Sequence, residues 1–501
     1  MSTLLHSYGR QGISRQAFMF KFKAILSALF FVTLVGCFHA KFLAQTVDRP
    51  PSVFTDAGLS RADAIRRYVL SSDYAYKQAG YLSNNIGPRL SGSPQAARAV
   101  EYVAEEMRRL GAEVRLQKCM VPHWVRGEAS GEVVEWTGMA PGTTQRIVLA
   151  ALGGSVATPD EGIATELVVV DDYDALAALG EQKVKGKIVL FNFKFDQQLQ
   201  SAGFGGGAYG QAVQYRFGAA MAAAKLGAVA VLVRSAGGSQ NRLAHTGSMG
   251  YADGIAKIPG AAVSYEDAEM LAYLAAAGPV KIKIRLTPRT LPDAESHNVI
   301  ADVKGSEHPE QIVIVSGHLD SWDLGTGALD DAAGVAASMA VIEALRALKI
   351  RPKRTIRFIA WMNEENGGRG SKAYFDELKD TLADHIAAIE ADLGASHPVG
   401  FNFAGKAEAI PLFAPLSKLL LLQGAAMVQH QPGGVGADIG PLTKAGVPSF
   451  APWYDQRTYF NYHHTAADTF DKIDPKQLAE VAALVSFLAV SLADMEGGLP
   501  R

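Results

Sequence analysis

Three apolar segments in the second half of the chain each lead directly into acidic or imidazole side chains. The segments 311–315, 355–362 and 385–392 have the pattern of buried strands, and helical patterns at 332–347 and 370–379 separate them. This alternation predicts an α/β domain with a mostly parallel sheet sandwiched by helices. In such sheets the functional groups gather at the carboxyl ends of the strands, so these side chains are expected to lie together.

The side chains at the predicted strand ends form a candidate site for two metal ions. The candidate ligands are His318, Asp330, Glu365, Asp392 and His464. Imidazole nitrogen and carboxylate oxygen are ligands that zinc takes, and Mn²⁺ or Co²⁺ can also occupy such a site. Paired metals ~3.5–4 Å apart need a carboxylate that bridges them. We expect Asp330 to be this bridge, because it lies on a glycine-lined loop just before the 332–347 helix.

Two further acids lie beside ligands and have expected catalytic roles. Asp320 is two residues beyond His318, where its carboxylate can accept the second N–H of the imidazole. Glu364 precedes Glu365, and it can take a proton from water and pass it to the leaving amine. Singly, each acid could be a helix-start or surface residue, but their joint occurrence at strand ends favours a functional site.

Four other residues are candidates for substrate contacts. They are Trp322, Asp323, Asp438 and Tyr462. Trp322 and Tyr462 could equally be packing residues, since large aromatic side chains often fill the core.

These motifs resemble the co-catalytic zinc exopeptidase family of aminopeptidases and glutamate carboxypeptidases. The matching segments are GHLDS, ALDDAAG, NEENGGRGS, ADLG and HTAADT, and further segments (IGPRLSGS, VPHWVRGE, HTG, and DPKQL through LADMEGGLP) are similar to its plasma glutamate carboxypeptidase branch. The resemblance implies one Zn²⁺ on His318 and Asp392 and a second on Glu365 and His464, with Asp330 bridging.

The resemblance also implies the roles of several neighbouring residues. Asp320 and Glu364 match the family's catalytic acids, and the Asp330–Asp331 peptide is expected to be cis. His464 is preferred over His463 because the family's ligand directly precedes a Thr/Ser-x-x-Asp-Thr motif.

The expected activity is that of a metallo-exopeptidase that hydrolyses short unblocked peptides, as a dipeptidase or carboxypeptidase does. A broad-specificity aminopeptidase is the alternative, because the hydrolysis of the amide is the same reaction at either end of a peptide. A binding or receptor module of the same fold would be expected to lack ligands, and no ligand is missing. A zinc acyltransferase or cyclase of this fold usually lacks an insert of the kind described next.

The region 151–290 has a different sequence pattern and is expected to be an inserted domain. Short β-rich segments alternate with alanine-rich helices, and the region resembles the family's protease-associated domain. The expected organisation is a signal peptide at 1–37, a linker at 38–62, a discontinuous peptidase domain at 63–150 and 291–498, and this insert. The glycine-rich run GFGGGAYG at 203–210 is expected to be a mobile surface loop rather than a nucleotide-binding loop.

The amino-terminal region predicts export. A charged stretch with Lys21 and Lys23 precedes the apolar run 24–36, which is too short to span a bilayer. The run ends in a lipobox-like Leu-Val-Gly-Cys, so Cys37 is expected to carry a lipid anchor in the periplasm or cell envelope. Cleavage near Ala40 or Ala44 with plain secretion is the alternative. The net charge of −2 without basic blocks gives no sign of nucleic-acid binding, and a homodimer is left open.

Overall fold

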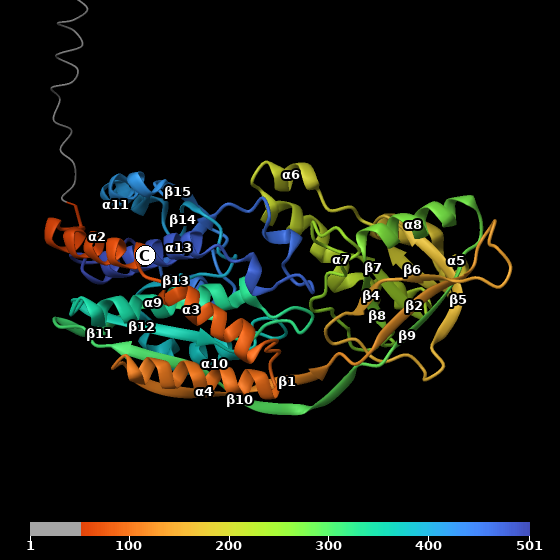
Figure 1. Ribbon diagram of the computed structural model, residues 1–501, viewed down its shortest axis with the longest axis horizontal. Helices are drawn as coiled ribbons and strands as arrows, with labels where there is room; N and C mark the ends of the chain where they lie inside the picture. The colour runs from red at the N-terminus through yellow and green to blue at the C-terminus, as the bar shows by residue number, and fades with distance from the viewer. Residues whose placement is uncertain (1–51) are drawn as a thin grey trace, which may run out of the picture. The chain divides into compact units, whose positions relative to one another are not determined.

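Two mixed sheets organise the part of the chain that the computed structural model describes, residues 52–501 (Figure 1). The expected signal peptide and Cys37 lie outside these residues. The strands of the first sheet, in spatial order, are β1 (Glu113–Val125), β10 (Arg289–Val303), β12 (Arg354–Trp361), β11 (His308–His318), β13 (His385–Glu390), β16 (Ser449–Tyr454), β14 (Pro398–Ala404) and β15 (Met427–His430).

The centre of the first sheet is parallel, as the sequence predicts. Strands β12, β11, β13 and β16 run in the same direction, so their carboxyl ends meet at one edge. The flanking pairs β1–β10, β10–β12 and β14–β16 are antiparallel, and the sheet is therefore mixed. Helix α11 (Ala414–Leu420) and the helical turn Leu421–Gln423 end at Gly424, which takes a left-handed conformation (φ +79°), and the chain then turns back into β15 beside β14.

Helices cover both faces of this sheet. Alternate residues of β11 face opposite layers: Val313 and Val315 pack toward one layer, and Ile314 packs toward the other. The covering helices are α2 (Asp56–Leu70), α3 (Tyr74–Gly80), α4 (Pro94–Arg109), α9 (Ala333–Ala347) and α13 (Pro475–Ala493) on the first side, and α10 (Arg369–Leu378) and α12 (Gly440–Lys444) on the second. Helix α13 is long and apolar enough to cross a membrane by composition, but it is mostly buried and serves as a core helix.

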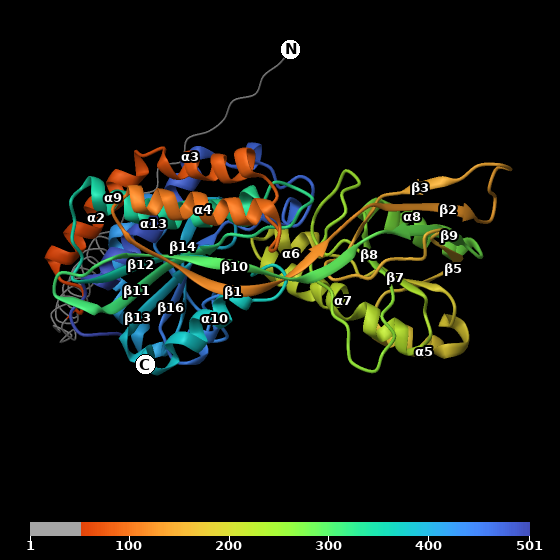
Figure 2. The same ribbon diagram turned by 90° about the horizontal axis from the view of Figure 1, so that it is seen from below.

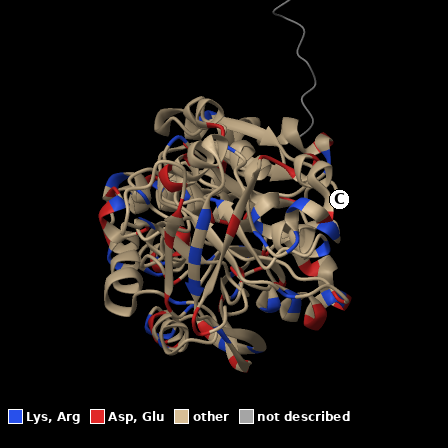
Figure 3. Cartoon of the chain, turned by 90° about the vertical axis from the view of Figure 1, so that its right-hand side faces the viewer, with Lys and Arg blue, Asp and Glu red and all other residues tan. Residues whose placement is uncertain are grey.

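The second sheet belongs to the insert. Its strands, in spatial order, are β3 (Gln145–Ile147), β2 (Ala129–Glu135), β9 (Lys281–Leu286), β5 (Ile163–Val170), β6 (Ile188–Phe191), β7 (Ala230–Arg234), β8 (Gly260–Val263) and β4 (Leu149–Ala151). Helix α8 (Tyr265–Ala277) covers one face, and α5 (Tyr173–Val184) and α7 (Gly205–Lys225) cover the other. Figure 3 looks onto this end of the molecule and shows basic and acidic residues interspersed.

Two expected boundaries differ from the structure. Helix α2 begins at Asp56 with Thr55 as its amino-terminal cap, so the linker expected at 38–62 is too long. The second sheet already includes β2, which pairs with β9, so the insert begins well before residue 151. The reason is the long antiparallel pair β1–β10, which runs from the first sheet toward the second and delivers the chain directly into β2 (Figure 2).

The glycine-rich run at 203–210 is a helix start rather than the expected loop. Helix α7 begins at Gly205, after a left-handed Gly203. A Cβ at Gly205 would lie 2.7 Å from the backbone oxygen of Gln456 and 2.8 Å from the ring of Phe460. The glycines therefore let α7 pack closely against the peptidase domain, which a loop prediction from composition does not reveal.

Arg89, in the IGPRLSGS motif, holds the loop between the predicted ligands His318 and Asp330. Its guanidinium is fully buried and donates five hydrogen bonds to backbone carbonyls, at 2.9–3.2 Å. Three of these carbonyls belong to Leu319, Thr326 and Gly327. Burial lowers the pKa of Arg89 to about 10, which still leaves it charged at neutral pH.

We predict that Arg89→Met lowers the free energy of unfolding by about 3–5 kcal/mol, because it leaves several buried carbonyls without a donor. The measurement is urea unfolding of the purified protein. The matched control is Arg98→Met on α4, where the side chain is 46% exposed and pairs with Glu101. Equal stability of the two variants would contradict the role assigned to Arg89.

Candidate metal centre

The parallel strands bring the predicted ligands to one edge of the first sheet. His318 is the last residue of β11, and Asp392 follows β13 by two residues. Asp330 lies in the turn Ala328–Ala332 that leads into α9. Its Oδ1 is 3.0 Å from Nε2 of His318, and its Oδ2 is 3.1 Å from Nε2 of His464. Asp330 therefore stands between the two histidines, as a bridge would.

Two groups of potential metal ligands share this aspartate. The first consists of His318, Asp330 and Asp392, and the second of Asp330, Glu365 and His464. Within each group the ligand atoms all lie within 4.8 Å of one another. Nε2 of His318 is 3.2 Å from Asp392, and Nε2 of His464 is 3.0 Å from Glu365. The structure thus brings all five predicted ligands together, and the Asp330–Asp331 peptide is cis, as the resemblance implies.

The donor set fits zinc. Oδ2 of Asp330 is buried and has no described partner in hydrogen-bonding geometry. Burial, with the neighbouring Asp330, raises the pKa of Glu365 to about 7, and burial likewise raises the pKa of Asp392. A concentration of buried carboxylates that resist ionisation is an environment that divalent cations stabilise, and nitrogen with oxygen donors is a set that zinc accepts.

Asp320 holds the turn that carries the two glutamates. Its carboxylate accepts hydrogen bonds from the backbone N–H groups of Asn363, Glu364 and Glu365 at 2.7, 3.1 and 3.3 Å. The expected contact with the imidazole of His318 is wrong, because Nδ1 of His318 instead faces the backbone carbonyl of Asp320 at 3.0 Å. The reason is the register of the adjacent strands, which sets His318 opposite Trp361 and the Asp320 side chain beside the following turn.

Glu364 is partly accessible and lines a cavity of about 310 Å³ together with four of the predicted ligands, Asp330, Glu365, Asp392 and His464. Burial raises the pKa of Glu364 well above its usual range, and the nearby Asp392 and Glu365 add to this effect. A carboxylate that binds a proton readily and faces a cavity beside potential metal ligands has the properties of a general base.

The insert supports the second group of ligands. The N–H of Thr246 donates to the backbone carbonyl of His464 at 2.9 Å, and the carbonyl of Thr246 lies 3.3 Å from Nδ1 of His464. Ser248 Oγ donates to the backbone carbonyl of Glu365 at 2.9 Å. These contacts from the insert fix the orientation of His464, a potential metal ligand of the peptidase domain. In the sequence, these contacts correspond to the short HTG motif at 245–247, which lies in the insert, far from the predicted ligands.

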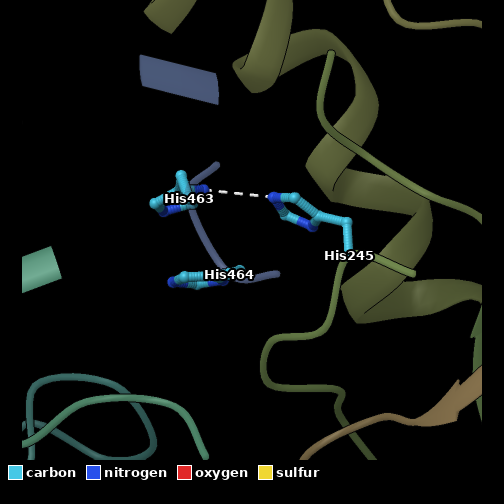
Figure 4. A group of neighbouring side chains, drawn as sticks. All are labelled: His245, His463 and His464. Carbon is cyan, nitrogen blue, oxygen red and sulfur yellow. Dashed lines mark hydrogen bonds between the residues drawn. The ribbon is translucent and has the colours of Figure 1, made fainter. Parts of the chain in front are cut away.

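His463 packs behind His464 and does not take its place. Their rings stack at a centroid distance of 3.7 Å, and Nδ1 of His463 lies 3.1 Å from Nε2 of His245 (Figure 4). Burial holds the pKa of both His245 and His463 well below the usual range, so both are neutral. His464 is the histidine whose Nε2 meets both Asp330 and Glu365, which agrees with its selection from the sequence motif.

None of the four predicted substrate contacts lines the 310 Å³ cavity. Trp322 packs against Gly153 of the insert and lines a small enclosed space beside the second ligand group, and Asp323 pairs with Arg126 at 2.9 Å. Asp438 is buried beside Glu390, which accepts hydrogen bonds from the backbone of its loop. Tyr462 lines a separate cavity.

Other residues line the 310 Å³ cavity beside the ligands, and sequence reasoning missed them. They include Tyr209 and Arg216 of α7, and Tyr459 and Phe460. Tyr209 and Arg216 lie on the insert, more than a hundred residues from the first ligand, so no local motif connects them with the site.

Both parts of the chain are similar to known protein families. The profile of peptidase family M28 matches residues 298–489, and the PA domain profile matches residues 153–271. Carboxypeptidase Q from Bos taurus is 36% identical over 436 residues, which cover 87% of this chain and 88% of that protein. The crystal structure of a peptidase M28 precursor from Shewanella amazonensis has a TM-score of 0.84 at 34% identity and covers 89% of this chain and 99% of its own. A zinc aminopeptidase from Bacillus subtilis shares the fold with a TM-score of 0.60 at 22% identity, over 85% of this chain and 98% of its own.

We predict that Asp330→Ala loses bound metal, because two cations would then face each other without a shared carboxylate. Elemental analysis of the purified protein measures the metal content per chain. The control is Asp376→Ala, on the exposed side of α10, which should keep the content of the unmodified protein. Two metals per chain in Asp330→Ala would rule out the bridging role.

Proposed function

This chain belongs to peptidase family M28 and is a zinc-dependent metallo-exopeptidase, and we propose that it uses two Zn²⁺ ions to hydrolyse short peptides that have a free carboxyl end. One ion would be held by His318 and Asp392, and the other by Glu365 and His464. Asp330 would bridge them. When bound, the ions would polarise the scissile carbonyl and lower the pKa of water at the site.

The observation that supports this mechanism best is the position of Glu364. Its side chain faces the same cavity as Asp330, Glu365 and Asp392, and its carboxyl group has a raised pKa. We propose that Glu364 takes the proton of the attacking water and delivers it to the nitrogen of the leaving amine. Asp320 acts through the backbone of the Glu364 turn, so it is a positioning residue in this proposal.

The preference for short peptides is proposed from the way the insert borders the cavity. Helix α7 contributes Gly206, Tyr209 and Arg216 to a wall opposite the predicted ligands, and the enclosed volume is about 310 Å³. A space of this size accommodates a small ligand rather than a long chain. Broad aminopeptidase activity is the competing function, since carbonyl chemistry alone does not select a chain end.

We predict that Glu364→Gln keeps its metal and loses at least ~10²-fold in turnover, the usual scale of general acid–base catalysis. Turnover is measured on an unblocked dipeptide, and metal content by elemental analysis. The control is Glu101→Gln on α4, whose side chain is 64% exposed. Near-normal turnover of Glu364→Gln with full metal content would reject it as the base.

The same assay on two blocked dipeptides tests the polarity. Acetylation removes the charge at the amino end, and amidation removes the charge at the carboxyl end. The proposal expects the unmodified enzyme to prefer the free carboxyl form. If the amidated peptide is cleaved as well as the free one while the acetylated peptide is inert, the enzyme is an aminopeptidase.

Export is proposed from the sequence alone. The charged stretch, the apolar run 24–36 and the lipobox-like motif predict a mature protein that begins at a lipid-modified Cys37. Mass spectrometry of the mature amino terminus measures this. Retention of residues 1–36, or an unmodified terminus at another position, would contradict the lipid anchor.

A further inference from the structure

An apolar groove lies on the peptidase domain, at the end of the molecule that is remote from the insert (Figure 1). Helix α11, the turn Leu421–Gln423 and strand β15 border this groove, and its volume is about 600 Å³. Among the described residues that line it, Lys418 is the only charged one, and apolar side chains such as Ile410 and Val428 predominate. None of these residues lines the 310 Å³ cavity, so the groove is not an extension of the metal centre.

Two adjacent leucines beside the groove point into solvent. Leu421 is 66% exposed and Leu422 is 93% exposed, the highest value among the large apolar residues that the structure describes. The surrounding sequence is also apolar, since Lys418 is the one charged residue in the segment 409–428. Single exposed apolar residues are common, but two leucines beside an open apolar groove form a patch, and such patches mark interaction surfaces. We call Leu421, Leu422 and the groove the apolar patch.

The turn that carries these leucines is held in place. Nη1 of Arg66, on α2, donates to Oε1 of Gln423 at 3.5 Å, and Nε2 of Gln423 donates to the backbone carbonyl of Glu480, on α13, at 2.8 Å. The preceding Leu420 is fully buried and already fills the adjacent part of the core. The turn therefore presents the next two leucines outward from a fixed backbone, as an interaction surface requires.

The apolar patch lies close to the place where the chain enters the described structure. Gln423 contacts Arg66, which is about 15 Å along α2 from the start of this helix at Asp56. Residues 38–51 precede the described part of the chain and can extend by at most ~50 Å. A lipid on Cys37, as proposed above, would therefore hold α2 and the patch near a membrane. Such a tether raises the local concentration of lipid at the patch, so a weak attraction is enough for docking.

The charge at the groove also suits a membrane. The side chain of Lys418 is exposed, and it forms no ion pair with an acidic side chain of the described residues. Anionic phospholipid headgroups attract a lysine that lies beside the bilayer. An apolar surface with a lysine at its edge has the composition of protein segments that lie in the membrane interface.

We propose that the apolar patch docks on an anionic phospholipid bilayer, with Leu421 and Leu422 among the acyl chains and Lys418 beside the phosphate groups. This inference goes beyond peptide hydrolysis, and it takes the proposed lipid on Cys37 as its tether. Because the groove and the 310 Å³ cavity share no lining residue, docking does not occupy the catalytic cavity.

The test places the fluorophore NBD on Leu422→Cys in the mature full-length protein, which is bound to vesicles of phosphatidylethanolamine and phosphatidylglycerol. Lipids with a nitroxide on the acyl chain quench NBD only on close approach, so the probe at position 422 should lose most of its fluorescence. The control is Tyr273→Cys on α8 of the insert, where the side chain is 77% exposed, and its probe should keep its fluorescence. Protein without either substitution is labelled in parallel, and any signal from Cys37 or Cys119 is subtracted.

Charge reversal tests the role of Lys418. In Lys418→Glu, quenching at position 422 should fall at least ~2-fold on these vesicles, because an attraction to anionic headgroups is replaced by a repulsion. The matched control is Lys372→Glu on α10, where the side chain is 65% exposed, and it should leave the quenching unchanged. Unchanged quenching in Lys418→Glu overturns the role assigned to this lysine.

Three results bear on the docking itself. Quenching at position 422 that does not exceed quenching at position 273 overturns it. A probe signal at position 422 that changes with protein concentration in the absence of vesicles shows that a second copy of the chain covers the patch, and this also overturns it. If mass spectrometry finds no lipid on Cys37, the labelled protein is mixed with the same vesicles. Quenching at position 422 alone then supports the docking without the tether, and its absence overturns the proposal.

Discussion

Buried negative charge at one edge of a parallel sheet is the constraint on which the rest of this structure depends. Ligand atoms of Asp330 lie within 4.8 Å of those of Asp392 on one side and of those of Glu365 on the other, and the imidazoles of His318 and His464 lie among them. Such a cluster is unfavourable unless cations neutralise it, because desolvation and mutual repulsion both oppose ionisation. The fold can hold the cluster because two separate sets of hydrogen bonds fix the backbone around it. Arg89 donates to carbonyls of the loop between His318 and Asp330, and Asp320 accepts from the backbone of the turn that carries Glu364 and Glu365.

The register of the central strands turns this constraint into a usable geometry. Pairing of β11 with both β12 and β13 places the ends of the three strands side by side, so the residues that follow each strand meet without any long excursion of the chain. The same register explains why Asp320 binds the backbone beside Glu364 rather than the imidazole of His318. A carboxylate that accepts three backbone N–H groups is well suited to holding a turn in one conformation, and a general base needs such a fixed position.

The sequence predicted the chemistry of the site better than its surroundings. His318, Asp320, Glu364, Glu365 and Asp392 could be located because each lies at or just beyond the end of an apolar strand, and central strands are easy to recognise. Asp330 was predicted from its glycine-lined loop, and His464 from the family motif. Strand β14 and the edge strand β15 were not predicted, because β14 contains proline and glycine and β15 is short and partly polar. The helix start at Gly205 was predicted to be a loop, because a high glycine content suggests flexibility. The cavity-lining Arg216 could not be found in this way, because the residues that it contacts beside the site, Thr246 and His464, are distant from it in sequence.

The peptidase domain and the insert contribute different groups to the site. The peptidase domain positions acids and imidazoles near strand ends. Such groups attract cations, whichever end of a peptide lies at the site. Both domains line the 310 Å³ cavity: the peptidase domain contributes carboxylates, imidazoles and aromatic side chains, and α7 of the insert contributes Gly206, Tyr209 and Arg216. Helix α7 reaches this cavity because its glycine start packs closely against the peptidase domain, and Thr246 of the insert donates a hydrogen bond to the backbone of His464. A change in the insert can therefore affect both the shape of the cavity and the position of His464.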